Sequence, residues 1–234
     1  MDARIDFPWP DGQPLRAVFS APRQSLRADR LEQVPAVLAA AERAALAGHW
    51  VVGWVAYEAA PAFDPALRVK ASAGSPLALF AVYDVGAAGG NDTVPCCDGS
   101  AVSGDSQGSK VALPGFFCRH WHSSMSESAA ASRIAKIHRG IRDGDYYQLN
   151  LTQRTRSEFS GAAETFFQAL TDSQPGAYAA YLDWGEGQIL SVSPELFFQR
   201  TGPMLTTRPM KGTAPRHLDP ADDFAAAEQL RASV

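Results

Sequence analysis

The sequence is poor in cysteine, in positive charge and in long apolar runs, and each shortage excludes a class of protein. Its three cysteines, among them the neighbours Cys96 and Cys97, form neither a disulfide framework nor a zinc-ligand spacing. A net charge of −4 argues against binding to a phosphate backbone, which requires a basic face. No apolar run approaches the roughly eighteen residues of a membrane span. We therefore expect neither nucleic acid nor a membrane as a partner.

The amino terminus also lacks an export signal. Residues 1–6 carry acids where a signal peptide has a basic region followed by an apolar core. We therefore expect a cytoplasmic protein. Hydrophobic residues make up 46% of the 234 residues and charged residues 20%, which is the balance of a globular chain and not of a disordered one.

Composition divides the chain into three parts. Between residues 86 and 114, Gly, Ser, Asp and Ala dominate, and the apolar residues follow neither helical nor strand spacing. Such a stretch is typical of a linker or a long loop. The predicted organisation is an N-terminal region over 1–85, a linker over 86–114 and a second region over 115–234.

The apolar pattern predicts a mixture of helices and strands. The predicted strands cover residues 50–57, 77–83, 147–156, 177–184, 188–192 and 196–200, and the predicted helices cover 35–47, 124–144, 163–175 and 219–234. Ser124 and Glu127 have the spacing of a capping box, and Gly144 fits a helix end. The polar face of 147–156 is equally well explained by solvent exposure. Strands that follow helices without regular βαβ alternation indicate an α+β fold.

Three polar clusters, at residues 144–154, 191–195 and 208–216, join reactive side chains to turn residues. In the last of them Lys211 follows a Pro-Met pair and precedes Gly-Thr. The proline restricts the backbone before the lysine and the glycine permits unusual backbone angles after it, and such a setting can orient the lysine amine. A lysine is a nucleophile only when neutral, which requires burial or a positive neighbour such as Arg208 or Arg216. The plainer interpretation is a surface loop lysine.

Glu195 is the second candidate, just after Ser193-Pro194. A glutamate can protonate a leaving oxygen if an apolar pocket raises its pKa. A solvated turn residue is again the plainer interpretation.

These clusters, in this order and spacing, resemble the chorismate-utilising enzymes, which include anthranilate synthase component I, aminodeoxychorismate synthase component I, isochorismate synthase and salicylate synthase. Residues 53–65 (GWVAYEAAPAFDP) resemble the N-terminal region of aminodeoxychorismate synthase component I, particularly the bacterial form fused to aminodeoxychorismate lyase. Lys211 favours that branch, because anthranilate synthases typically carry Ala at the matching position.

The resemblance implies roles for four residues. Lys211 attacks C2 of chorismate while Glu195, as general acid, protonates the departing C4 hydroxyl, and ammonia then displaces the lysine. Gly212 and Thr213 approach a substrate carboxylate. The product, 4-amino-4-deoxychorismate, leads to p-aminobenzoate and folate, so the expected enzyme is a transferase. The implied fold is a four-layer α/β/β/α sandwich, with the first part of the chorismate-binding domain over 115–234 and a regulatory pocket in 1–85.

The resemblance also implies partners and a metal. A glutamine amidotransferase subunit supplies the ammonia, and tryptophan fills a pocket near Tyr57 in relatives. Relatives continue beyond the position of Val234 with the glutamates that bind Mg²⁺, so no metal ligand is assigned in this chain. We expect a C-terminally incomplete fold that forms no product by itself. The alternatives are anthranilate synthase component I and an inactive fragment that acts as a binding module.

Overall fold

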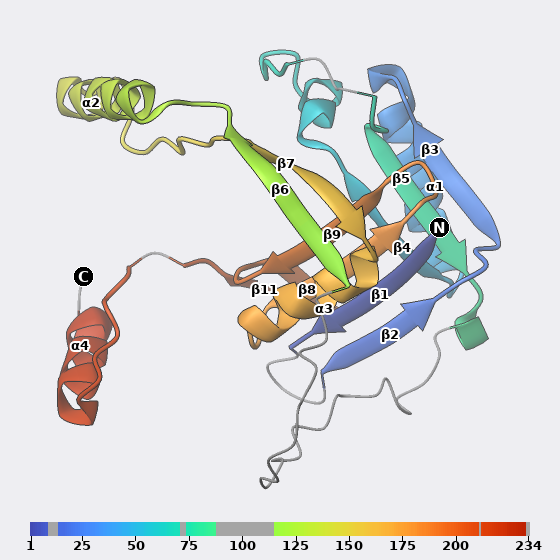
Figure 1. Ribbon diagram of the computed structural model, residues 1–234. Helices are drawn as coiled ribbons and strands as arrows, with labels where there is room; N and C mark the ends of the chain where they lie inside the picture. Colours follow the sequence, from blue (N-terminus) through green and yellow to red (C-terminus); the bar gives the residue numbers. More distant parts are fainter. Residues whose placement is uncertain (9–13, 71–73, 88–114, 211, 233–234) are drawn as a thin grey trace, which may run out of the picture. The chain divides into compact units, whose positions relative to one another are not determined.

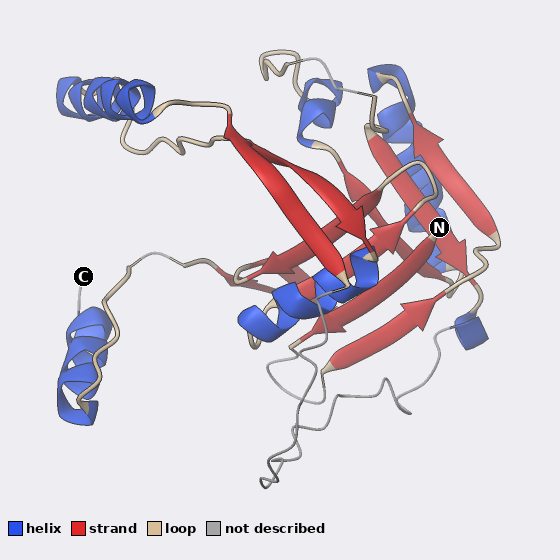
Figure 2. Cartoon of the chain, in the orientation of Figure 1, coloured by secondary structure: helices blue, strands red, loops and turns tan. Residues whose placement is uncertain are grey.

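The structure is a computed structural model that describes residues 1–8, 14–70, 74–87, 115–210 and 212–232. Its elements are coloured by type in Figure 2 and labelled in Figure 1. The strands are β1 (Asp2–Phe7), β2 (Leu15–Phe19), β3 (Gln24–Ala28), β4 (Trp50–Val55), β5 (Ala78–Tyr83), β6 (Phe116–Ser123), β7 (Thr155–Gly161), β8 (Tyr178–Asp183), β9 (Gln188–Ser193), β10 (Leu196–Thr201) and β11 (Met204–Arg208). The helices are α1 (Val34–Leu46), α2 (Glu127–Asp143), α3 (Ala163–Ser173) and α4 (Pro220–Ala232), with 3-10 turns η1 (Leu31–Gln33), η2 (Tyr57–Ala62) and η3 (Val85–Ala87).

The chain divides into two compact units, Met1–Cys96 with Thr171–Val234, and Cys97–Leu170. In the first unit β2-β1-β8-β9 form one antiparallel sheet and β3-β5-β4 form a second, while β10 and β11 form a separate two-stranded ribbon (Figure 1). The second unit contains the antiparallel ribbon of β6 and β7. This mixture of helices and antiparallel sheets confirms the predicted α+β class.

The two sheets of the first unit pack face to face. β1 alternates acidic or basic residues with Ala3, Ile5 and Phe7, and this period of two turns the small and apolar side chains toward the second sheet. They share one core cluster with Phe19 of β2 and Tyr83 of β5. Burial of this apolar surface is the main force that holds the sheets together.

Helix α1 covers the other face of the second sheet. Phe80 and Val82 of β5 point to this face and pack with Val34 and Ala41 of the helix. Pro35 lies in the first turn, where its missing N–H costs no hydrogen bond. The first unit is therefore stacked as helix, sheet, sheet, which is the order that the predicted sandwich requires.

Most predicted elements are present, but the strand predicted over 147–156 is wrong. The segment before Thr155 is irregular, and ladder pairing with β6 covers only Thr155–Gly161. Tyr147 is 91% exposed, so the alternation of apolar residues is not reinforced by burial. The predicted capping box is also wrong, because the N-cap of α2 is Ser126, whose hydroxyl accepts from the Ala129 N–H.

The predicted linker lies mostly outside the described residues, and the boundaries at 85 and 114 stay a prediction. β8 and β9 belong to the same sheet as β1, so the segment after the linker and the N-terminal region share one sheet. Cys118 has a free thiol, while Cys96 and Cys97 lie outside the described residues.

Candidate functional site

Glu195 occupies the short turn between β9 and β10. The Ser193 hydroxyl donates to the Glu195 carbonyl oxygen at 3.1 Å and accepts from the Glu195 N–H at 3.3 Å. This local pairing closes the turn with a side-chain hydroxyl, as serine commonly does. The Glu195 side chain is exposed. A substrate hydroxyl can therefore reach the carboxyl from solvent.

The ribbon of β10 and β11 connects the two predicted catalytic positions. Leu196, directly after Glu195, is paired with Arg208, the last residue of β11. The chain then continues through Pro209 and Met210 to Lys211. Glu195 and Pro209 thus flank the same end of one antiparallel ribbon, and Lys211 follows Pro209 by two positions in the sequence. The placement of Lys211 itself lies outside the described residues.

Gly212 and Thr213 are exposed on the segment that leads into α4. The same segment carries Arg216, which forms an ion pair with Asp223 in the first turn of α4. Hydrogen bonds from the Arg216 side chain and from the His217 N–H lower the pKa of Asp223 to about 2, and Asp223 in turn raises the pKa of Arg216. Because Asp223 balances the charge of Arg216, the electrostatic help that Arg216 could give to a neutral Lys211 is reduced.

The cluster at 144–154 belongs to the second unit. Gly144 ends α2 with a left-handed backbone (φ 82°), and the Asp145 N–H donates to the Gly140 carbonyl oxygen. Tyr146 folds back over Gly140, where an added Cβ would lie 2.4 Å from the tyrosine hydroxyl oxygen. A side chain at residue 140 would therefore require the Tyr146 ring to shift. Further along, the Arg154 N–H donates to the Ser124 hydroxyl at 2.8 Å.

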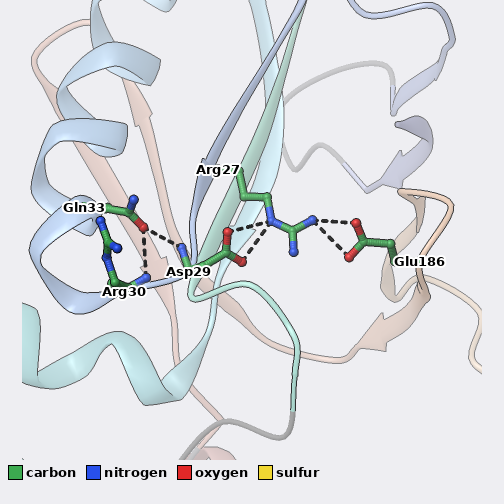
Figure 3. A network of polar contacts seen from close by, with 5 residues as sticks. All are labelled: Arg27, Asp29, Arg30, Gln33 and Glu186. Carbon is green, nitrogen blue, oxygen red and sulfur yellow. Dashed lines mark hydrogen bonds and ion pairs between the residues drawn. The ribbon is translucent and has the colours of Figure 1, made fainter.

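A polar network joins the two sheets of the first unit (Figure 3). Arg27 of β3 donates from Nε to both carboxylate oxygens of Asp29 and from Nη1 to both oxygens of Glu186, at 2.8 to 3.0 Å. Glu186 lies in the turn between β8 and β9, and these partners raise the pKa of Arg27. Gln33 accepts from the N–H groups of Asp29 and Arg30 and thereby fixes the entry to α1. The hydrogen bonds between Arg27 and Glu186 thus connect β3 to the β8–β9 turn.

Aromatic packing supports the same connection. The rings of Trp54 and Trp184 lie 4.7 Å apart, and a Cβ at Gly187 would lie 2.5 Å from the Trp184 ring. Tyr57, where the resemblance implies a pocket, is exposed on η2. The expectation of bound tryptophan stays a prediction.

The described ranges contain no group of three or more His, Cys, Asp or Glu residues that could hold a metal ion. These described residues therefore offer no Mg²⁺ site, no step of the proposed reaction depends on the metal, and the Mg²⁺ expected from the resemblance stays a prediction. None of the helices in these ranges is long and apolar enough to cross a membrane.

The sequence analysis did not predict two ion pairs, Arg216 with Asp223 and Arg27 with Glu186. The helix predicted over 219–234 already placed Asp223 near its start, where a carboxylate is favoured, but no pattern indicated that Arg216 is its partner. No local signal indicates the pairing of Arg27 with Glu186, because 159 residues separate them.

A solved structure and a family model both match this chain. A crystal structure of a Bacillus anthracis protein, described as a 2,3-dihydroxybenzoate-specific isochorismate synthase, matches 99% of this chain and 54% of its own, with a TM-score of 0.60 and 16% identity. The chorismate binding enzyme family matches residues 9–234, so the chain belongs to that family.

Curated relatives include two kinds of enzyme. Aminodeoxychorismate synthase component 1 of Salmonella typhimurium is 34% identical over 114 residues, which is 49% of this chain and 25% of that protein. Its counterpart in Escherichia coli K12 gives the same values. Anthranilate synthase component 1 of Streptomyces coelicolor is 32% identical over 113 residues, which is 48% of this chain and 22% of that protein. The chain thus spans about a quarter of the length of these relatives.

Proposed function

We propose that this chain is part of an aminodeoxychorismate synthase component I, which converts chorismate and ammonia to 4-amino-4-deoxychorismate on the route to p-aminobenzoate and folate. The observation that carries the proposal is the β10–β11 ribbon, whose one end is flanked in the chain by both Glu195 and the Met-Lys-Gly-Thr motif. The relatives of that name, at 34% identity, support the same branch.

In the proposed reaction the neutral amine of Lys211 attacks C2 of chorismate, the ring double bonds shift, and the C4–O bond breaks. Glu195 gives its proton to the departing hydroxyl, which leaves as water, and the alkylated amine returns a proton to the carboxylate. Ammonia then attacks C4, the double bonds shift back, and the bond between C2 and Lys211 breaks as the amine takes up the proton that ammonia loses. The covalent step divides one difficult displacement into two easier ones. Gly212 and Thr213 contribute N–H and hydroxyl donors to a carboxylate of the substrate.

Mass spectrometry of the full-length protein that contains this chain, after incubation with chorismate and acid quenching, tests the nucleophile. We expect a chorismate-derived adduct on Lys211 that is lost in Lys211→Ala and kept in Lys136→Ala, which removes an exposed lysine of α2. An adduct on another residue, or none, would exclude the proposed covalent route.

Glu195→Gln tests the general acid. Its effect on adduct formation should be a loss of roughly 10²- to 10⁴-fold in rate, the range for removal of a general acid. Glu42→Gln, which changes an exposed glutamate on α1, is the matched control and should leave the rate unchanged. An unchanged rate in Glu195→Gln would leave Glu195 as a turn residue only.

Anthranilate synthase component I is the second candidate, because relatives of that name reach 36% identity over 111 residues. It predicts release of pyruvate and of fluorescent anthranilate, without a lysine adduct. Lys211 favours the first candidate, since the resemblance places alanine there in anthranilate synthases.

Partners follow from the same proposal. The relatives are named as component 1, which implies a second component, and we infer a glutamine amidotransferase that delivers ammonia. Calorimetric titration separates this enzyme from a binding module, because a module would bind tryptophan but not chorismate. A cytoplasmic location stays a prediction.

A further inference from the structure

The segment after the Gly212–Thr213 pair is attached to α4 at two separated points. At the first point Arg216 donates two hydrogen bonds to the Asp223 carboxylate, from Nε to Oδ1 at 2.8 Å and from Nη2 to Oδ2 at 2.9 Å. The adjacent His217 N–H donates to Asp223 Oδ1 at 3.0 Å. A planar guanidinium held by both carboxylate oxygens has little freedom to rotate. Both the side chain and the backbone of the segment are therefore anchored on one carboxylate.

The carboxylate itself sits on a fixed support. Asp219 caps α4, where its Oδ1 accepts from the N–H groups of Ala221 and Asp222 at 2.8 and 3.2 Å. The Asp223 N–H donates to the Asp219 carbonyl oxygen at 3.0 Å. Asp223 thus belongs to a capped first turn.

The second point of attachment lies at the other end of the segment. A Cβ added at Gly212 would lie 2.6 Å from Leu230 Cδ1, so the Gly212 backbone rests against that side chain. Asp223 and Leu230 are seven residues apart and lie on one face of α4, roughly 10 Å from each other along the axis. The segment 212–217 therefore runs back along this face, from the last turn to the first, as Figure 1 shows beside α4.

The ion pair between Arg216 and Asp223 restricts the conformation of the 212–217 segment but adds little to the free energy of unfolding. The Arg216 side chain is 88% exposed and that of Asp223 is 26% exposed, and ion pairs in such settings have a small effect on the free energy of unfolding. What the pair does restrict is the path of a short loop whose other end is Gly212. A substrate donor on such a loop acts only if its position is held within a fraction of an ångström.

We propose that Arg216 and Asp223 act as positioning residues, a clamp on α4 that holds the Gly212–Thr213 donors in place for a carboxylate of chorismate. This inference rests on the proposed function for its ligand, but the clamp itself does not. A competing role for Arg216 is direct contact with the substrate carboxylate. The two roles differ in what Asp223 does: under the clamp Asp223 supports binding, and under direct contact it competes with the substrate for Arg216.

Hydrogen exchange of the His217 amide, whose N–H donates to Asp223 Oδ1, measures the clamp without substrate. Asp223→Ala and Arg216→Ala should each accelerate exchange by about tenfold or more, as expected for loss of charge-assisted bonds. Asp222→Ala is the matched control, because it removes one acid from the same helix turn, and it should leave this rate unchanged. Circular dichroism at 222 nm checks that α4 persists in all variants. Equal exchange in Asp223→Ala and Asp222→Ala would overturn the clamp.

Titration calorimetry of the full-length protein with chorismate then measures how the clamp affects binding through the Gly212–Thr213 donors. Asp223→Ala should weaken binding roughly tenfold to a hundredfold, and the swapped pair Arg216→Asp with Asp223→Arg should recover most of the loss. Binding that is unchanged or tighter in Asp223→Ala, or no recovery in the swapped pair, would assign Arg216 to direct contact and refute the positioning role. Absence of chorismate binding by the unmodified full-length protein would refute the proposed function and this role with it, while the exchange data would still decide whether the clamp exists.

Discussion

Phe19→Ala tests the packing of the two sheets at its centre. Phe19 is 1% exposed on β2, and its ring lies 5.0 Å from that of Tyr83 and 5.6 Å from that of Trp50, both in the opposite sheet. Truncation removes the ring from the shared core cluster and leaves a cavity that these aromatic neighbours can only partly fill. Substitutions of this kind cost about 3–5 kcal/mol. Against a typical total of about 5–15 kcal/mol, this is a large share of the free energy of unfolding.

Urea denaturation provides the assay, with tryptophan fluorescence as the signal because Trp50 lies beside the altered ring. The midpoint should fall while the slope of the free energy against urea stays constant. Phe197→Ala is the control, since this ring is 84% exposed on β10, and its change in unfolding free energy should stay within about 0.5 kcal/mol. If Phe19→Ala lost no more than Phe197→Ala, the face-to-face packing described above would be refuted.

Three further outcomes are expected. Gly53→Ala should cost about 1–3 kcal/mol by chemical denaturation, because the new Cβ would lie 2.1 Å from a carbonyl oxygen of β5, whereas Gly86→Ala meets nothing within 4 Å and should be neutral. Arg27→Gln should lower the melting temperature slightly at low salt and have less effect at high salt, since its pair with Glu186 is exposed and ions screen it; an equal loss at both salt concentrations would contradict this. Asp223, with its pKa lowered from 3.8 to about 2, binds fewer protons when folded, so its contribution to stability is complete above about pH 5 and is lost between pH 4 and 2; a carboxyl NMR titration with a midpoint near 4 would disprove the pairing.

Much of the fold could be predicted because long periodic segments carry their own signal. The helix over 35–47 and the strand over 77–83 match α1 and β5 to within a residue or two. β1 was missed although Ala3, Ile5 and Phe7 alternate with charged residues, and a test for period two at the terminus would have found it. The segment 147–154 shows the opposite error: its apolar residues do alternate, but among the described residues no strand pairs with it to form a ladder.

The candidate site was less predictable, because tertiary pairing determines it. Glu195 and Lys211 were singled out from turn chemistry and a family resemblance, but the pairing that brings the residues next to them, Leu196 and Arg208, together depends on β11, which the sequence pattern did not indicate. The ribbon turns at Gly202, and its register shifts between Leu196 and Gln199, so that Leu196 lies opposite Arg208. Likewise, the bond between Arg216 and Asp223 depends on the backward path of the loop along α4.

The surroundings of Glu195 explain why the chain by itself is expected to form no product. A carboxyl acts as a general acid near neutral pH when an apolar setting disfavours its charged form, and a lysine becomes nucleophilic when water is excluded from its amine. Glu195 is exposed, and so are the apolar side chains of the ribbon beside it, namely Phe197, Phe198, Met204 and Leu205. Covering these side chains would exclude water from both faces of the ribbon. Covering the apolar side chains of the ribbon would therefore also give Glu195 the apolar surroundings that its proposed role requires.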